Sequence, residues 1–262
     1  MKVNEKWRKL GWRDPLWDYV RFFSVFKGEQ RSQWVAKLRK GIFEVEPGKE
    51  LDVPEGTIER VLDYLDNRDA DLAVAADLLR TSGDAIAFCD SLKFKVGMTT
   101  TKLKGWTDSP QAMVAAVTGT ALMVCAQNST SLVSKPDRRC LWLIENHLHV
   151  TARNLDGAVP TLANPKIIWE IKEYWGKTKG GSKMSDAVYE CNLVGRELRD
   201  FEERTKHKRI THVIFVDGKE QWAHRKSDLR RMIDLFHQGL VDHLFIGREV
   251  ETEWAQTLKS LL

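Results

Sequence analysis

The chain has 262 residues, of which 42% are hydrophobic and 30% are charged. This composition is ordinary for a globular protein, and the length suits one large domain or two small ones. No apolar run approaches the ~18 residues of a membrane span. The charged N-terminus lacks the apolar segment of a secretory signal, so we expect no membrane partner.

The four cysteines are widely spaced, and none forms a C-x-x-C pair, which argues against a zinc ribbon and against a redox motif. Each lies in an apolar stretch, where buried free thiols are common. Free thiols favour a reducing, cytoplasmic location. The four residues are Cys89, Cys125, Cys140 and Cys191.

The net charge of +4 is unevenly distributed, because residues 1–40 alone carry a surplus of seven positive charges. Two helical stretches are expected there, with aromatic residues between the basic ones. Most of these aromatics are expected to pack in a core. A basic segment on a near-neutral body is consistent with nucleic-acid binding, and the alternative is a solvated amphipathic helix pair.

Residues 41–56 contain Pro-Gly turns and predict a short extended piece. Helices are then expected over residues 57–65, 71–79 and 84–92, the last with Asp84 as a candidate N-cap. Residues 1–100 are therefore predicted to form an N-terminal helical subdomain that is both basic and aromatic, with a possible role in DNA recognition.

The second part of the chain, residues 101–262, begins with a long apolar helix over 110–127. We expect strands at 141–145, 147–152, 166–172, 210–216 and 242–247, and further helices at 185–204, 227–237 and 251–261. Three strands in a meander, followed by a helical crossover to a fourth, predict an α/β fold. Its mixed central sheet would carry helices on both faces.

Two opposite charges interrupt the apolar strand at 166–172. Side chains alternate along a strand, so Glu170 and Lys172 share one face while Trp169 and Ile171 share the other. If the strand at 147–152 is an antiparallel neighbour, the chain that follows it brings Asp156 close to Glu170.

Two carboxylates beside an ammonium suit a hard divalent cation. Mg²⁺ prefers oxygen ligands, which Asp156, Glu170 and the carbonyl of Ile171 would supply. Such a cation would stabilise charge on a scissile phosphate and activate a water molecule. Lys172 would hold the attacking water or stabilise the phosphate oxygens in the transition state.

Asp156, followed after thirteen residues by Glu170-Ile171-Lys172, resembles the motif of the PD-(D/E)XK nuclease superfamily, whose best-known members are restriction endonucleases. The order of elements over residues 108–250 is similar to the core of that superfamily. The resemblance implies a restriction-endonuclease-like core and Mg²⁺-dependent phosphodiester hydrolysis. It also implies that Asp156 and Glu170 bind the metal and that Lys172 is the catalytic lysine. The chain departs from the motif at Leu155, where a proline is expected.

A second triplet of the same form, Asp217-Gly218-Lys219, is present in the chain. It follows a β-branched strand, and Asp-Gly is a turn signal, so we interpret it as a turn.

Four further residues are candidates for the same site. Glu145, at the end of a predicted strand, would be an auxiliary acid or an acid that supports the metal ligands. Lys177, Lys179 and Lys183 lie in a Gly-rich loop after the catalytic strand, where they would either contact a phosphate backbone or stay in solvent. Glu190 and Arg196 lie on the helix after that loop, and Glu190 is a secondary candidate that would face either the metal or solvent. A basic cluster at residues 225–231 would either contact DNA or form a solvated face.

The sequence thus predicts a Mg²⁺-dependent endonuclease of double-stranded DNA, in the first place a type II restriction endonuclease. Such an enzyme is expected to be a homodimer, since two sites are needed to cut two strands. Two alternatives remain open. One is a defence or repair nuclease of low sequence specificity, and the other is an inactive nuclease-like protein that binds nucleic acid.

Overall fold

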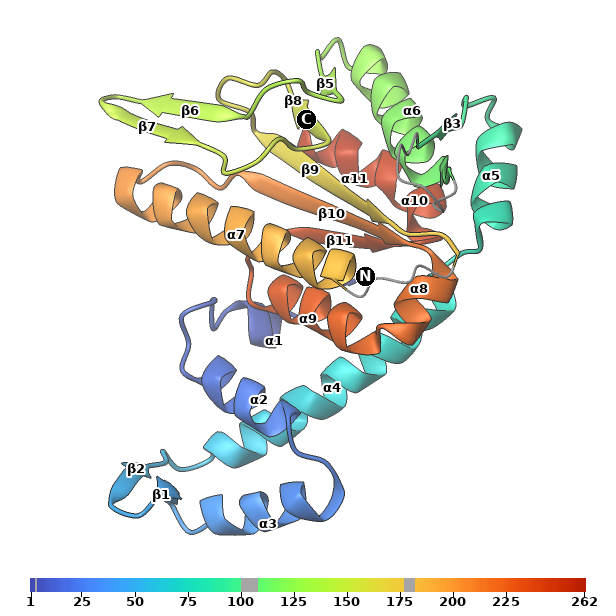
Figure 1. Ribbon diagram of the computed structural model, residues 1–262. Helices are drawn as coiled ribbons and strands as arrows, with labels where there is room; N and C mark the ends of the chain where they lie inside the picture. Colours follow the sequence, from blue (N-terminus) through green and yellow to red (C-terminus); the bar gives the residue numbers. More distant parts are fainter. Residues whose placement is uncertain (3, 100–107, 177–181) are drawn as a thin grey trace.

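The computed structural model describes residues 1–2, 4–99, 108–176 and 182–262. Its centre is a five-stranded mixed sheet with the strand order β11-β10-β9-β8-β5 (Figure 1). The last three strands of the chain run parallel, whereas β8 is antiparallel to β9 and β5 is antiparallel to β8. These strands are β5 (Val133–Ser134), β8 (Gly157–Val159), β9 (Ile167–Glu173), β10 (Thr211–Asp217) and β11 (His243–Ile246).

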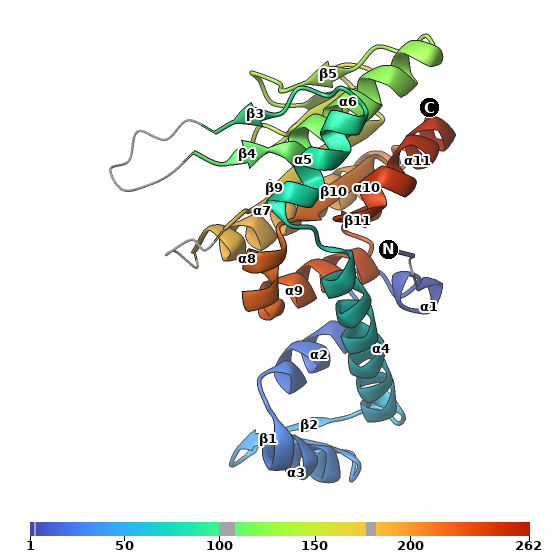
Figure 2. The same ribbon diagram turned by 90° about the vertical axis from the view of Figure 1, so that its right-hand side faces the viewer.

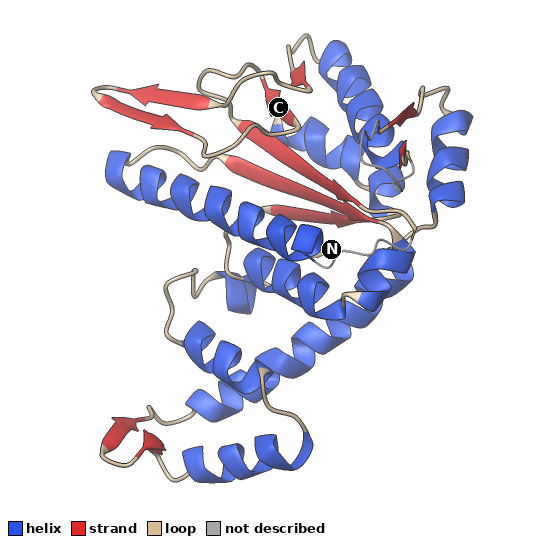
Figure 3. Ribbon diagram, in the orientation of Figure 1, coloured by secondary structure: helices blue, strands red, loops and turns tan. Residues whose placement is uncertain are grey.

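Helices cover both faces of this sheet (Figure 3). One face packs against α5 (Ser82–Ser91), α6 (Ala112–Gln127), α10 (Glu249–Thr252) and α11 (Trp254–Leu261). The other packs against α7 (Ser182–Thr205), α8 (Lys219–His224), α9 (Lys226–His237) and the second half of α4 (Thr57–Leu78). A mixed sheet flanked by helices confirms the expected α/β class.

Strand alternation explains why both faces are apolar. In β10, Val213 and Phe215 contribute to the core under α6 and α11, while Ile214 and Val216 contribute to the core under α7 and α9. A strand covered on both faces reads as a continuous apolar run rather than an alternating one.

The first part of the chain forms a smaller lobe, most of which lies around the first half of α4 (Figure 2), while its first helix lies beside α9. Trp7 and Trp17 pack edge to face against Tyr64 of α4, with ring centroids 5.2 and 5.1 Å apart. Several aromatics of the basic segment therefore form a core, as expected. The lobe consists of α1 (Glu5–Arg8), α2 (Leu16–Ser24), α3 (Gly28–Leu38), β1 (Ile42–Glu46) and β2 (Lys49–Asp52).

The prediction of two separate helices over 57–65 and 71–79 was wrong, because α4 runs unbroken from Thr57 to Leu78. No Gly or Pro interrupts it. The apparent gap contains Arg68, which is buried and lies 3.4 Å from Asp234 of α9, so a charged residue faces the interior there. In α5 the N-cap is Thr81 rather than Asp84, and the two form a reciprocal capping box.

A three-strand meander is present, but two of the three strands predicted for it were wrong. The strands predicted at 141–145 and 147–152 form a separate hairpin of β6 (Leu141–Ile144) and β7 (His147–Val150). Their places in the sheet are taken by β5 and β8, which are too short for side-chain alternation to reveal them. A further short ribbon pairs β3 (Gly97–Met98) with β4 (Pro110–Gln111).

All four cysteines are buried and free, as the sequence predicts. Within the described parts of the chain, no helix has the length and apolarity needed to cross a membrane.

Glu173, the last residue of β9, joins the sheet to α6. Its carboxylate accepts hydrogen bonds from the Met113 N–H at the start of α6 (2.8 Å) and from the Trp175 indole (3.1 Å). Burial raises the pKa of Glu173 from its ordinary value of 4.5 to about 7, although these hydrogen bonds oppose the shift. Its ionisation therefore opposes folding.

Replacing Glu173 with Gln should change the pH dependence of stability. The Glu173 carboxyl binds its proton more tightly in the folded state than in the unfolded state. Its contribution to the free energy of unfolding is therefore fully present below pH 4.5 and is lost as the pH rises to about 7. The variant keeps a hydrogen-bond acceptor but does not titrate. Urea unfolding at pH 5 and pH 8 should show Glu173→Gln gaining up to about 3 kcal/mol on wild type over that range. A constant difference would contradict the prediction.

Candidate active site

The site begins with the register between β8 and β9. Gly157 pairs with Trp169, and a Cβ at Gly157 would lie 2.0 Å from the indole ring, so only glycine fits there. The Asp156 N–H donates to the Trp169 carbonyl (3.0 Å), which keeps the residue before Gly157 on the same ladder. Asp156 is thereby held at the edge of β9.

The Asp156 carboxylate lies against the backbone of β9. Its Oδ2 accepts a 2.7 Å hydrogen bond from the N–H of Ile171. Burial raises the pKa of Asp156, the hydrogen bond from Ile171 lowers it, and the nearby Glu170 carboxylate raises it again. The register agrees with this, because the antiparallel pairing of Gly157 with Trp169 puts Asp156 opposite Glu170. The predicted approach of Asp156 to Glu170 is real, although β8 rather than β7 brings it about.

Glu170 and Lys172 form a buried ion pair beneath α7. Their side chains are 1% and 5% exposed, and Lys172 Nζ lies 2.6 Å from Glu170 Oε2. Burial disfavours the ammonium, but the Glu170 carboxylate outweighs this effect and raises the pKa of Lys172. Lys172 is therefore charged at neutral pH and acts as a hydrogen-bond donor in this state.

A second ion pair lies over the first. Arg153 Nη1 contacts Glu190 Oε2, and these side chains are 33% and 38% exposed. Each also reaches the buried pair, because Arg153 Nε lies 3.5 Å from Glu170 Oε2 and Glu190 Oε2 lies 2.8 Å from Lys172 Nζ. We call Glu170–Lys172 the inner pair and Arg153–Glu190 the outer pair.

The donor set fits a hard cation such as Mg²⁺. Glu170 Oε1 is buried and has no hydrogen-bond partner, which is costly unless a ligand satisfies it. The N–H and C=O of one strand residue point to the same edge, so the Ile171 carbonyl lies on the edge that Asp156 occupies. Two carboxylates and one carbonyl would leave room for water ligands. Over the described residues no group of three or more His, Cys, Asp or Glu side chains is placed to hold a metal.

Of the other candidates that the structure describes, neither Glu145 nor Lys183 is shown in contact with Asp156 or Glu170. Glu145 lies in the exposed turn of the β6–β7 hairpin, at its outer end in Figure 1. Lys183 lies exposed in the first turn of α7, where its carbonyl is 3.5 Å from the Tyr174 hydroxyl. Lys177 and Lys179 lie outside the described residues.

Arg153 was missed by sequence reasoning, and Glu190 was only a secondary candidate. Glu190 reaches the site because α7 crosses the face of β9 that carries Glu170. Arg153 reaches it because the chain turns between β7 and β8. Neither relation has a fixed spacing in the sequence. Leu155, at the position of the motif's proline, is buried in the core with Trp142 and Phe201.

The rival triplet at Asp217 has a structural role. Asp217 Oδ2 lies 2.6 Å from Arg80 Nη2, both side chains are fully buried, and Oδ1 accepts from the Arg80 N–H. Gly218 has a φ of 115° and leaves no room for a side chain, since a Cβ would lie 1.9 Å from the Tyr174 carbonyl. The predicted turn is therefore real, and its carboxylate anchors the connection between α4 and α5.

Comparison with known families gives one match. A family model described as a domain of unknown function, DUF7687, covers residues 75–261. The chain belongs to the DUF7687 family. No curated protein and no solved structure matches it. All residues of the inner and outer pairs, and Asp156, lie within the DUF7687 domain.

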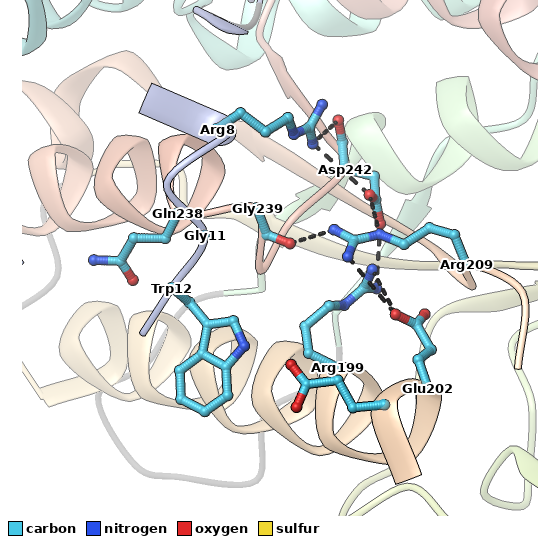
Figure 4. Close-up of a pocket in the computed structure, with 10 residues that line it drawn as sticks. Arg8, Gly11, Trp12, Arg199, Glu202, Arg209, Gln238, Gly239 and Asp242 are labelled. Atoms are coloured by element: carbon cyan, nitrogen blue, oxygen red, sulfur yellow. Dashed lines mark hydrogen bonds and ion pairs between the residues drawn. The ribbon is translucent and has the colours of Figure 1, made fainter. Parts of the chain in front are cut away.

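A separate polar cavity of about 440 Å³ lies where the N-terminal lobe meets the DUF7687 domain (Figure 4). Asp242 is its centre, with Oδ1 2.9 Å from Arg209 Nε and Oδ2 3.3 Å from Arg199 Nη2. Glu202 closes a ring of alternating charges, 3.2 Å from Arg199 and 3.7 Å from Arg209. Arg8 of the lobe donates to the Asp242 carbonyl (2.8 Å). These charges neutralise one another, so we assign this cavity to the joint between lobe and domain.

Replacing Asp242 with Asn should destabilise this joint. Arg199 is only 3% exposed and would keep Glu202 but lose its other counter-charge, and a hydrogen bond to a charged group contributes about 1.5–3 kcal/mol. Urea unfolding at pH 7 should show a loss of that order. Asp200→Asn is the matched control, because its exposed pair with Arg13 should contribute less than about 1 kcal/mol. Equal losses in the two variants would show that the joint does not depend on Asp242.

Proposed function

We propose that this DUF7687 protein is a Mg²⁺-dependent endonuclease that hydrolyses phosphodiester bonds of double-stranded DNA. One observation carries the proposal. Asp156 and the inner pair Glu170–Lys172, which are separated in sequence by thirteen residues, converge at the β8–β9 edge with a carboxylate oxygen left unpartnered. These are the residues through which the sequence resembles the PD-(D/E)XK superfamily.

The topology supports the same proposal. The helix α6 is followed by β5, β8 and β9, each antiparallel to the next, and α7 then leads to β10, which is parallel to β9. This is the α-β-β-β-α-β order of that superfamily's core, with the β6–β7 hairpin inserted after β5. A restriction-endonuclease-like core is therefore part of the proposal.

Asp156, Glu170 and the carbonyl of Ile171 would hold the cation. When bound, Mg²⁺ supplies charge stabilisation for the phosphate and lowers the pKa of a coordinated water. The strand β9 contributes rigidity, since it pairs with β10 along its whole length and so holds Glu170 and Lys172 in fixed positions. Such preorganisation is what a site for phosphoryl chemistry requires.

Lys172 would act through its charge. The Glu170 carboxylate keeps the Lys172 amine protonated. The resulting ammonium can donate hydrogen bonds to a phosphate oxygen but cannot accept a proton. Its stem and its partner are buried beneath α7, which excludes bulk water and strengthens that interaction.

The surface beside the site supports a polyanionic substrate. Tyr189, next to Glu190 on α7, is exposed, and the guanidinium of Arg231 lies 5.4 Å from its ring centre. Asp228 is fully buried and pairs with both Arg225 and Arg231, so this group of three side chains is positively charged overall. Nucleic-acid backbones are bound through such clusters.

A type II restriction endonuclease, acting as a homodimer in a reducing cytoplasm, is the specific form of this proposal. A nuclease of low sequence specificity uses the same site, and the fragments of a digested plasmid distinguish the two. Discrete fragments indicate a restriction enzyme. The near-complete burial of Glu170 favours a second candidate, an inactive nuclease-like protein in which the charges only stabilise the fold.

Substitution of the site residues tests the proposal directly. With Mg²⁺ and plasmid DNA, Asp156→Asn and Lys172→Met should each lower the cleavage rate at least ~100-fold, since they remove a metal ligand and a charge on the phosphate. Thermal unfolding checks that each variant folds. Glu145→Gln, in the exposed hairpin turn, is the matched acid control and should cleave normally.

EDTA should abolish cleavage by the wild-type protein. If no DNA is cut by wild type with Mg²⁺ or Mn²⁺, the inactive alternative holds. Activity that survives in Asp156→Asn would place the catalytic centre elsewhere.

A further inference from the structure

The outer pair covers the site that we propose to bind metal. Glu170 is 1% exposed, and its free Oε1 is shielded from solvent. Arg153 and Glu190 are the partly exposed charges that contact the inner pair, and they contact each other. A cation that binds Glu170 would therefore lie next to the Arg153 guanidinium.

Charge explains why an arginine occupies this position. Asp156, Glu170 and Glu190 bring three negative charges together, and Lys172 supplies one positive charge. A second cation offsets the mutual repulsion of carboxylates that are packed together in a buried place. The Arg153 guanidinium supplies it through contacts with both Glu170 and Glu190.

The backbone around Arg153 is anchored on both sides, so movement would be confined to its side chain. The Thr151 N–H donates to the Cys140 carbonyl (3.0 Å), and the Thr151 hydroxyl donates to the Arg153 carbonyl (2.8 Å). The Ala152 N–H donates to Glu197 (2.9 Å), and Asp156 is fixed on the β8–β9 ladder. The Arg153 side chain is one-third exposed, so it has solvent into which it can rotate.

We propose that Arg153 is the internal counter-cation of the metal-free site, and that a divalent cation binding to Asp156 and Glu170 displaces it. The outer pair is then a gate that closes the site when no metal is bound. This inference rests on the proposed function, and it assigns a role to a residue that the superfamily motif does not contain.

The displaced guanidinium has a second partner within reach. Once released from Glu170, Arg153 lies at the mouth of the site, where the phosphate of a bound substrate would approach. Arginine binds carboxylate and phosphate with the same planar array of donors. Metal and substrate would thus convert one ion pair into another without leaving a buried charge unpaired.

Metal binding by the full chain tests the gate without relying on activity. Mn²⁺ is titrated calorimetrically at constant ionic strength into wild type, Arg153→Gln and Arg153→Lys. Removing a positive charge beside a divalent ion should tighten Mn²⁺ binding roughly tenfold or more in Arg153→Gln. Arg153→Lys keeps the charge and should stay within roughly threefold of wild type on the same grounds.

Two controls make the result specific. Arg138→Gln removes an arginine that is 83% exposed and pairs with Asp137, so its Mn²⁺ affinity should equal that of wild type. Asp156→Asn should abolish the binding, which places the bound Mn²⁺ at this site. If Arg153→Lys does not fold, the Mn²⁺ affinities of Arg153→Gln and Arg138→Gln still show whether loss of the Arg153 charge tightens metal binding.

Unchanged or weaker Mn²⁺ binding in Arg153→Gln overturns the gate, and so does equal tightening in Arg153→Lys. If wild type binds Mn²⁺ through Asp156 and only the Arg153 effect is missing, the proposed function stands without the gate. If Arg153→Gln binds Mn²⁺ tightly but no variant cuts DNA, the gate stands and the nuclease proposal fails. Absence of Asp156-dependent binding in every variant overturns both.

Discussion

The register between β8 and β9 is the constraint on which the candidate site depends. Only glycine fits at residue 157, because the Trp169 indole packs directly on the β8 backbone. A shift of one residue would turn Trp169 away from its core and bring Glu170 and Lys172 to the wrong face, since side chains alternate. The same register places the Asp156 carboxylate on the N–H of Ile171. Packing on one face of the sheet thus sets the geometry of charges on the other.

Charge on a buried strand is otherwise difficult to explain. A buried ion pair gives little net stability compared with well-packed apolar side chains, because both ions must leave water. The inner pair beneath α7 is therefore expected to add little net stability by itself. The fully buried Arg80–Asp217 pair differs, because it hydrogen-bonds backbone as well as side chain and holds two helices to the sheet.

The N-terminal lobe is connected to the DUF7687 domain through charged side chains as well. Its aromatics are largely occupied in its own core, and Arg8 reaches across to the charge ring around Asp242. Whether the lobe reads DNA, and whether a domain boundary lies near residue 100, both stay predictions. The shared helix α4 packs on α2 with its first half and on α9 with its second, so the two parts are mechanically continuous.

The sequence by itself determined the α/β class, the main helices and the strand β9 with Glu170 and Lys172 on one face, because each follows from a local periodicity. It also predicted that Asp156 would approach them. The tertiary structure alone decided which strands border β9, since β5 and β8 have too few residues for any periodicity to show. It alone brought Arg153 and Glu190 over the inner pair. Such contacts depend on how a helix crosses a sheet and where a loop turns, and the spacing of residues along a chain records neither.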